Sequence, residues 1–268
     1  MILLLGGTSD TAPLAQGLAE AGYRVLVSTA TDIPLDVGVH ANIRRRSGRL
    51  DEEGMAILIR EDGIRAIVDT THPYATVARK TARHVADRLN IPYFTFIRPT
   101  GLIDREAVIL AGSHEEAARI ACSMGEPVLL TTGVKNLDAY VREARRACVR
   151  LVVRVLPERA SIAACRAAGI EEGCIIAERG PFSVEDNMSA IERYRIGVLV
   201  MKDSGPSGGT PEKLEAARIE GCLVVVVRRP EKPTHNSFEE LSELISAVKA
   251  RITKQEPSEA SPLVHIGG

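Results

Sequence analysis

Short apolar runs and amphipathic stretches alternate along most of this chain. The runs 2–5, 198–201 and 223–227 are apolar at every position, which is typical of strands buried on both faces. Between such runs, as in 11–21 and 137–146, apolar residues recur every three or four positions, which predicts helices with one buried face. The alternation therefore predicts an α/β fold of parallel sheets covered by helices.

The same pattern gives bounds for each element. It predicts strands at 2–5, 23–29, 41–46, 66–70, 93–97, 107–110, 128–131, 149–156, 174–178, 198–201 and 223–227, with 41–46 polar enough to be an edge strand. It predicts helices at 11–21, 51–62, 76–90, 113–124, 137–146, 161–168, 184–194, 211–220 and 238–252. The periodic pattern is interrupted near 98–105, where Arg-Pro-Thr-Gly begins a new half.

We therefore expect two doubly wound, Rossmann-like parallel-sheet domains, at residues 1–99 and 100–253, with a cleft between them. The first is the expected dinucleotide-binding domain and the second the expected substrate domain. Residues 254–268 are rich in Pro, Ser and Glu, which predicts a disordered tail.

Composition narrows the setting. The net charge of −1 over 268 residues means that the protein has no overall positive charge to attract nucleic acid or an anionic membrane. Any anion-binding site must therefore depend on a local group of basic residues. No basic leader and no apolar run of membrane length are present, and we expect a cytoplasmic protein. Five cysteines form no Cys-x-x-Cys pair or Cys/His cluster, so we expect small buried residues and neither a metal site nor a disulfide framework.

The first candidate loop is Gly6, Gly7, Thr8 and Ser9, directly after the first strand. Glycines let the backbone approach a phosphate, and the next helix offers its free N–H groups and the positive end of its dipole. The full Gly-x-Gly-x-x-Gly fingerprint is absent, so an ordinary strand-to-helix turn is the alternative. The N-terminal position favours a dinucleotide pyrophosphate.

Two further loops belong to the first half. The second strand ends at Thr29, followed by Asp32, and an acidic residue there suits the free 2′-hydroxyl of NADH. Arg44–Arg46 reaching this strand end would suit NADPH instead, and the run is otherwise a solvated edge or a contact for substrate carboxylates. Thr70, Thr71, His72 and Pro73 form a stiff loop expected to line the nicotinamide or substrate. His72 is either an acid–base group or a histidine that holds its own turn.

In the second half, Thr132, Gly133 and Lys135 follow one strand, and Lys202, Asp203, Ser204 and Gly205 follow another. A flexible surface loop would explain the glycines of 202–210, but not a lysine and an aspartate directly after a buried strand. We therefore expect ligand contact there. Serine-hydrolase, P-loop and zincin motifs are absent, which disfavours hydrolysis and phosphoryl transfer.

Taken in order, these stretches resemble one family, the precorrin-6A reductases of corrin-ring (vitamin B12, cobalamin) biosynthesis. The matching stretches are Gly6–Thr8 with Leu14-Ala15, Ser47–Leu50, Asp69–Ala75, Arg98-Pro99, Thr131–Gly133 with Lys135–Leu137, Arg154–Pro157, Gly180–Phe182 and Lys202–Gly205. They cover residues 1 to about 230. The resemblance implies hydride transfer from NADH or NADPH to a ring carbon of precorrin-6A, or its cobalt form, giving precorrin-6B.

The resemblance also implies roles for the loops. Gly6–Ser9 would hold pyrophosphate, and Thr70–Pro73 would position the nicotinamide. Thr132, Gly133, Lys135, Lys202, Asp203, Ser204 and Gly205 would contact a tetrapyrrole rich in carboxylates. The proton would come from water, Asp203 or His72.

Two departures from the family pattern stand out. Asp10 replaces a glutamate, and the second strand end lacks an arginine common in NADPH-using members. The second departure leaves the choice between NADH and NADPH open and fits the cobalt-dependent, anaerobic branch better. The rival readings are a methyltransferase or sugar-nucleotide enzyme with the same glycine turn, or a dinucleotide sensor without catalysis.

Overall fold

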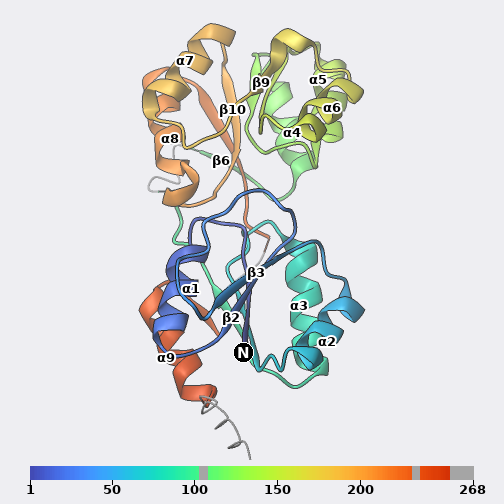
Figure 1. Cartoon of the computed structure of the whole chain (residues 1–268). Coiled ribbons are helices and arrows are strands. Elements are labelled where there is room, and N and C mark those ends of the chain that lie inside the picture. The colour runs from blue at the N-terminus through green and yellow to red at the C-terminus, as the bar shows by residue number, and fades with distance from the viewer. Residues whose placement is uncertain (103–107, 231–235, 254–268) are drawn as a thin grey trace, which may run out of the picture. The chain divides into compact units, whose positions relative to one another are not determined.

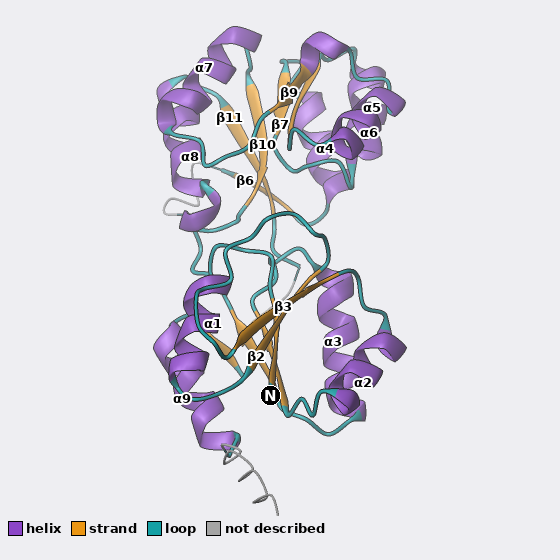
Figure 2. Ribbon diagram, in the orientation of Figure 1, coloured by secondary structure: helices purple, strands orange, loops and turns teal. Residues whose placement is uncertain are grey.

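The computed structural model describes residues 1–102, 108–230 and 236–253. The described chain divides into two compact units. One contains Met1–Ile97 and the C-terminal residues 236–253, and the other contains 98–230. Each unit has a parallel β-sheet with helices on both faces (Figures 1 and 2). The predicted α/β class, with two parallel-sheet domains, is confirmed.

The sheet of the first unit is six-stranded, in the order β12-β5-β4-β1-β2-β3. Its strands are β1 (Ile2–Leu5), β2 (Val25–Thr29), β3 (Ile43–Ser47), β4 (Ala66–Asp69), β5 (Tyr93–Phe96) and β12 (Ser237–Phe238). Every pairing is parallel. The carboxyl ends of the central strands therefore meet at one edge, where the loops after β1, β2 and β4 begin.

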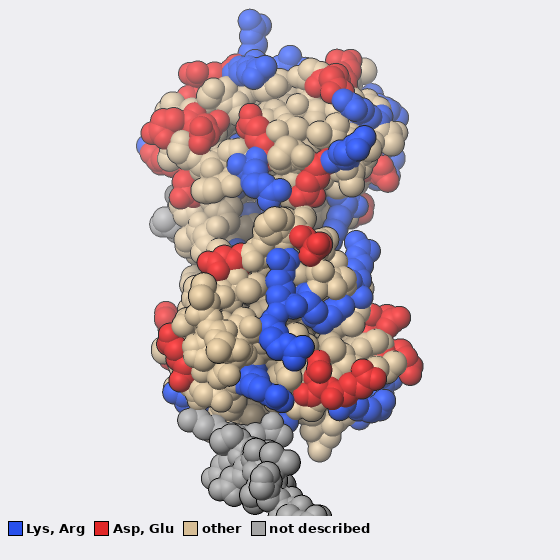
Figure 3. All heavy atoms as spheres, in the orientation of Figure 1, with Lys and Arg blue, Asp and Glu red and all other residues tan. Residues whose placement is uncertain are grey.

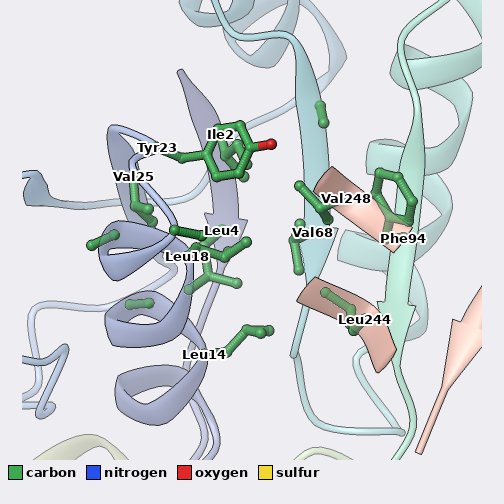
Figure 4. Packing of buried hydrophobic residues seen from close by; sticks show 14 of the residues in the cluster. Ile2, Leu4, Leu14, Leu18, Tyr23, Val25, Val68, Phe94, Leu244 and Val248 are labelled. Carbon is green, nitrogen blue, oxygen red and sulfur yellow. The ribbon is translucent and has the colours of Figure 1, made fainter. Parts of the chain in front are cut away.

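Alternate residues of these strands supply two cores. Ile2 and Leu4 point to α1 (Thr11–Glu20) and α9 (Leu241–Arg251), whereas Leu3 and Leu5 point to α2 (Glu52–Glu61) and α3 (Thr76–Arg88). Figure 4 shows the first of these cores. Its labelled residues come from β1, α1, the turn before β2, the first residue of β2, β4, β5 and α9: Ile2, Leu4, Leu14, Leu18, Tyr23, Val25, Val68, Phe94, Leu244 and Val248.

The C-terminal elements correct the domain boundaries expected from the sequence. Residues 236–253 were expected in the second domain, but β12 pairs with β5, and Leu244 of α9 is fully buried in the first core. Gly17 of α1 allows the close approach of α9, because a Cβ there would lie 2.5 Å from Ile245 Cδ1. The apolar period of α9 indicated a buried face without indicating which sheet covers it. The tail expected at 254–268 lies outside the described residues.

The sheet of the second unit has the order β6-β11-β10-β7-β8-β9. Its strands are β6 (Ile109–Ala111), β7 (Val128–Leu130), β8 (Leu151–Val155), β9 (Ile175–Ala177), β10 (Val198–Lys202) and β11 (Leu223–Val227), again all parallel. Its helices are α4 (His114–Ser123), α5 (Leu137–Ala147), α6 (Arg159–Ala167), α7 (Val184–Tyr194) and α8 (Thr210–Ile219). Met201 points to the core shared with α7 and α8, so its neighbour Lys202 points to the opposite face.

Two smaller expectations fail. The last helix was expected to begin at Phe238, but Phe238 lies in β12, whose two residues carry no periodic signal, and α9 begins at Leu241. Cys148 was expected to be buried but is exposed, since it ends α5 in the left-handed conformation with φ 55°. Among the described helices, none combines the length and apolar character that crossing a membrane requires.

Candidate functional site

The glycine turn after β1 is shaped by Thr11, the first residue of α1. The Thr11 hydroxyl accepts hydrogen bonds from the Gly7 and Thr8 amides, both at 3.2 Å. A Cβ on Gly6 would lie 2.7 Å from Thr11 Cγ2, so only glycine fits there. Gly7 is exposed at φ +127°, with open space where a Cβ would stand. Sequence reasoning missed Thr11, which fixes the turn from inside.

The turn after β1 is joined to the loop after β4. The Thr8 hydroxyl donates to the Thr70 carbonyl at 2.9 Å, and the Thr70 hydroxyl donates to the Leu5 carbonyl at 3.0 Å. Both threonines are buried, whereas Ser9 is exposed. The structure thus brings two of the predicted loops together. It also uses the Thr8 and Thr70 hydroxyls inside the protein, and leaves the exposed backbone around Gly7 as the surface of the turn.

The end of β2 is surrounded by arginine side chains from β3. Arg46 Nη1 donates to Ser28 Oγ at 2.7 Å, and Arg45 Nη2 donates to Thr29 Oγ1 at 3.3 Å. The parallel pairing explains this proximity, because Ser28 lies opposite Arg46. Basic side chains gather over β3 in Figure 3. Asp32, expected to contact a ribose, is exposed in the loop that follows β2.

The loop after β4 is held by a buried ion pair. Asp69 is fully buried, and its Oδ2 accepts from Arg79 Nε at 3.0 Å and from the Tyr93 hydroxyl at 2.5 Å. Its Oδ1 accepts from the Thr71 amide and hydroxyl, at 2.8 and 2.7 Å. Arg79 Nη2 also donates to the Thr71 carbonyl at 3.1 Å. Burial and the neighbouring Asp69 carboxylate raise the pKa of Tyr93, which keeps its hydroxyl a donor.

Neither Arg79 nor Tyr93 was predicted as a site residue. Arg79 lies one helical turn into α3, where an arginine ordinarily faces solvent, and nothing in its spacing reveals that Asp69 neutralises it. The pair fixes the position of Thr71, and therefore the loop expected to line the nicotinamide.

His72 lies in that loop and is half-buried. Its Nδ1 accepts from the Tyr74 amide at 3.3 Å, and its carbonyl accepts from the Ala75 amide at 2.8 Å. The ring also lies 5.5 Å from the Tyr74 ring, centroid to centroid. Pro73 is buried beside it. These contacts are those of a histidine that holds its own turn, the second of the two alternatives drawn from the sequence.

In the second unit, Lys202 at the end of β10 reaches the loop after β7. Its Nζ donates to the Thr132 carbonyl at 2.9 Å. Burial and the charge of Lys135 lower the pKa of Lys202 to about 8. Lys135 is exposed, and Gly133 has φ +79° with open space at its Cβ position. The structure therefore brings together four of the residues expected to contact substrate: Thr132, Gly133, Lys135 and Lys202.

Asp203 has a different environment. It is 5% exposed. Its Oδ1 accepts from the Gly101 and Gly205 amides at 3.0 and 3.1 Å, and its Oδ2 accepts from the Thr100 hydroxyl at 2.9 Å. Arg229 Nε completes the set, 3.1 Å from Oδ2. Donors of the protein occupy both oxygens of this carboxylate, so Asp203 holds the surrounding segments together and is poorly placed to pass a proton to a ligand.

The glycine-rich segment after Asp203 is tightly packed. Gly205 has φ +75°, and a Cβ there would lie 2.8 Å from the Pro99 carbonyl oxygen. The Ser204 amide donates to Thr210 Oγ1 at 3.1 Å, and Arg98 Nη1 donates to the Ser204 carbonyl at 3.3 Å. The structure thus explains Gly205 by the close approach of residues 98–101. Its expected contact with substrate stays a prediction, as does that of Ser204.

Another buried arginine lies on the other face of this sheet. Arg154 of β8 is 6% exposed, its Nη2 donates to Asn187 Oδ1 at 2.6 Å, and its guanidinium lies 4.0 Å from the Phe182 ring centroid. Asn187 Nδ2 donates in turn to the Ser183 carbonyl at 2.6 Å. Burial lowers the pKa of Arg154 to about 10. Arg154 thus fastens the Gly180–Phe182 segment to the sheet, which connects two of the stretches behind the family resemblance.

Comparison with known proteins agrees with the resemblance drawn from the sequence. The family model described as precorrin-6x reductase CbiJ/CobK matches residues 1–249. The cobalt-precorrin-6A reductase of Priestia megaterium is 35% identical over 90% of this chain and 96% of its own length. The cobalt-precorrin-6A reductase of Methanocaldococcus jannaschii is 33% identical over 92% and 97%.

A solved structure also has this fold. It is described as CobK precorrin-6A reductase and is 20% identical, with a TM-score of 0.74 over 95% of this chain and 99% of that chain. Because the family model covers nearly the whole chain, the family expected from the ordered loops is confirmed. The chain belongs to the precorrin-6x reductase CbiJ/CobK family and is an oxidoreductase.

Proposed function

We propose that this protein reduces one carbon–carbon double bond in the ring of cobalt-precorrin-6A, using NADPH, to give cobalt-precorrin-6B. Family membership supports the reaction class, and relatives that are 33–35% identical to this chain are named for the cobalt form. The metal-free precorrin-6A is the alternative substrate, because relatives named for it are 31% identical.

The arginines of β3 are the observation that supports NADPH. Arg46 and Arg45 bring two guanidinium groups to Ser28 and Thr29, at the strand end where dinucleotide-binding domains contact the adenosine ribose. Guanidinium groups suit the dianionic 2′-phosphate, which NADH lacks. Asp32, which favoured NADH from the sequence, is exposed in the loop after β2, and no hydrogen bond of the described residues brings it to Ser28 or Thr29. We therefore propose the phosphorylated cofactor in place of NADH.

The rest of the first unit fits such a cofactor. Gly7 offers exposed backbone and open space beside the N-terminus of α1, where the helix dipole favours phosphate. The residues we assign to cofactor binding are Gly6, Gly7, Thr8, Ser9, Thr29, Thr70, Thr71, His72 and Pro73, with Arg45 and Arg46 added. Thr8 and Thr70 act by fixing the two loops against one another.

The second unit supplies the substrate contacts. Lys202 and Lys135 are cations at the carboxyl edge of a sheet, in a chain whose net charge is only −1. They suit a macrocycle with acetate and propionate arms. Thr132 and Gly133 contribute backbone close to Lys202, and Ser204 and Gly205 lie next to it in sequence.

When bound, the nicotinamide would supply the hydride for one ring carbon, and a proton for the adjacent carbon would complete the reduction of the double bond. The residues of the chain bind, orient and exclude water. Because Asp203 is held by amides, a hydroxyl and Arg229, and His72 Nδ1 holds its own turn, we assign the proton to solvent.

The test is anaerobic incubation of the purified protein with cobalt-precorrin-6A or precorrin-6A, each with NADPH or NADH, followed by absorbance of the macrocycle and the nicotinamide. Stoichiometric oxidation of NADPH with a change in the macrocycle spectrum supports the proposal. Binding of S-adenosylmethionine in place of nicotinamide would support the methyltransferase rival. Cofactor binding without oxidation in the presence of either macrocycle would support the sensor.

A further inference from the structure

A histidine and a tyrosine outside every predicted loop form a pair in the second unit. His114 is the first residue of α4, just beyond the carboxyl end of β6, and its Nδ1 lies 2.9 Å from the Tyr140 hydroxyl of α5. The rings meet edge to face, with centroids 5.8 Å apart. Tyr140 is fully buried and His114 is half-buried.

The burial of Tyr140 determines which nitrogen of His114 carries the proton. A fully buried hydroxyl that donates to nothing costs free energy, and the well-formed hydrogen bond of the Tyr140 hydroxyl is the one to His114 Nδ1, 2.9 Å away. The Tyr140 hydroxyl therefore donates, Nδ1 accepts, and Nε2 carries the hydrogen of the neutral ring. Among the described residues no hydrogen bond to His114 Nε2 is formed, because the hydrogen bond of this ring is the one between Nδ1 and Tyr140.

The pair stands beside residues already assigned to substrate. Burial and, next to it, the charge of the Lys202 ammonium lower the pKa of His114 to about 4, against a smaller opposite effect of Glu115. Neutral His114 therefore persists at physiological pH. Thr132 is 8% exposed, and its buried hydroxyl lies near the Tyr140 hydroxyl without a well-formed hydrogen bond. The His114 Nε2–H group and the Thr132 hydroxyl can therefore still bind a ligand at the carboxyl edge of this sheet, on the face that α4 and α5 cover and next to the Lys202 ammonium.

We propose that His114 is a further substrate-binding residue, whose Nε2–H donates to a carboxylate of the macrocycle beside Lys202, with Tyr140 as the positioning residue that fixes its tautomer. This inference rests on the proposed function. A carboxylate fits because it accepts from several donors at once, and because a neutral donor beside one ammonium recognises it without adding a second buried charge.

Two substitutions separate the two nitrogens of His114. His114→Asn puts an amide oxygen near the Nδ1 position, keeps an acceptor for Tyr140 and removes the Nε2–H donor. His114→Gln places a side-chain NH₂ near the Nε2 position and removes the acceptor. Tyr140→Phe leaves the ring in place without its hydrogen-bond partner.

The measurements are KM and kcat for the macrocycle, the Kd of the macrocycle without cofactor, the Kd of NADPH and the melting temperature. We expect His114→Asn to raise KM and Kd for the macrocycle roughly 10- to 100-fold, the loss of one hydrogen bond to a charged group. Its kcat, NADPH affinity and melting temperature should stay near those of the wild type. We expect His114→Gln to bind the macrocycle better than His114→Asn, and Tyr140→Phe to lie between wild type and His114→Asn.

The opposite ranking would overturn the inference. If His114→Asn binds the macrocycle like the wild type while His114→Gln and Tyr140→Phe only melt earlier, the pair is structural. If the wild type neither binds nor reduces either macrocycle, the proposed function fails and this inference fails with it. If the wild type reduces the macrocycle and His114→Asn has the same KM as the wild type, this inference is rejected and the proposed function still stands.

Discussion

Arg229 and Asp203 form an ion pair in which one guanidinium nitrogen serves two acceptors of the same residue. Arg229 Nε lies 3.1 Å from Asp203 Oδ2 and donates to the Asp203 carbonyl, also at 3.1 Å. Its Nη2 donates to the Pro99 carbonyl at 3.0 Å. Arg229 follows β11, and Pro99 lies where the second unit begins. The pair therefore fastens three separate segments of this unit.

Asp203→Asn should destabilise the protein without removing an acid catalyst. The amide nitrogen would face donors and leave Arg229 partly uncompensated, so we expect a loss of about 3 kcal/mol in the free energy of unfolding. The kcat of the folded enzyme should change less than tenfold, well below the loss of about 100-fold or more that follows removal of a general acid. Urea unfolding and steady-state kinetics measure the two effects.

Glu215→Gln is the matched control for Asp203→Asn, because Glu215 pairs with Arg218 at an exposed surface. Exposed pairs contribute little, and we expect no measurable change in its unfolding. A stable Asp203→Asn protein with kcat reduced by three orders of magnitude would instead return Asp203 to the role of proton donor.

Most of the fold was predictable because it follows from local pattern. Buried parallel strands are continuous apolar runs and their helices keep a regular period, so both sheets could be expected, including the edge strand β3 with its arginines. The placement of α9 was not predictable. Its Leu244 needs a buried surface, and the choice of the first sheet depends on the contact of Phe238 and α9 with β5, which no local pattern encodes.

The candidate site divides in the same way. The loops that follow strands can be predicted from the sequence, because the parallel sheet brings their starts to one edge. The contacts that each polar side chain makes cannot be predicted in this way. Asp203 is accounted for by Arg229, which lies 26 residues away. His114 becomes interesting only through Tyr140, which is also 26 residues away and on another helix.

Arg79→Met should unfold the first unit more easily and weaken cofactor binding. Removing Arg79 leaves the fully buried Asp69 carboxylate without its counter-charge, which costs about 3–5 kcal/mol. Tyr93→Phe removes one hydrogen bond to the same carboxylate and should cost about 1.5–3 kcal/mol. Lys80→Met, on the exposed face of the same helix, is the control. Equal urea midpoints for Arg79→Met and Lys80→Met would contradict this account.

Arg46→Met should separate the two nicotinamide cofactors. If Arg46 contacts the 2′-phosphate, the Kd of NADPH rises roughly 10- to 100-fold and the Kd of NADH does not change. Fluorescence titration of each reduced cofactor measures both. Arg24→Met is the control, because Arg24 is exposed and lies just before the amino end of β2, whereas Arg46 contacts the carboxyl end of that strand. A parallel loss of NADH affinity would show that Arg46 supports the fold and does not select the cofactor.

His72→Asn should remain an active enzyme. The asparagine oxygen replaces Nδ1 as acceptor for the Tyr74 amide, so the turn is preserved. We expect kcat within about threefold of wild type, whereas loss of an acid–base group costs about 100-fold or more. His72→Leu removes the acceptor and should weaken NADPH binding instead. A collapse of kcat in His72→Asn with intact cofactor binding would make His72 the proton donor.

Lys202 should make macrocycle binding sensitive to alkaline pH. Its pKa is lowered to about 8 by burial and by Lys135, so the side chain is charged below pH 8 and neutral above it. Because a carboxylate binds the charged form, KM for the macrocycle should rise as the pH passes from 8 to 9.5. The bound carboxylate stabilises the ammonium, so the midpoint in kcat lies at higher pH than the midpoint in kcat/KM.

Three variants test whether deprotonation of Lys202 causes the alkaline rise in KM. Lys202→Arg stays charged across this range and should give a KM that does not vary with pH, whereas Lys202→Ala should give a high KM at every pH with unchanged NADPH affinity. Lys135→Ala removes the repulsion on Lys202 and should move the wild-type midpoint upward. If the alkaline rise in KM persists in Lys202→Ala, another group titrates, and Lys202 does not bind the substrate through its charge.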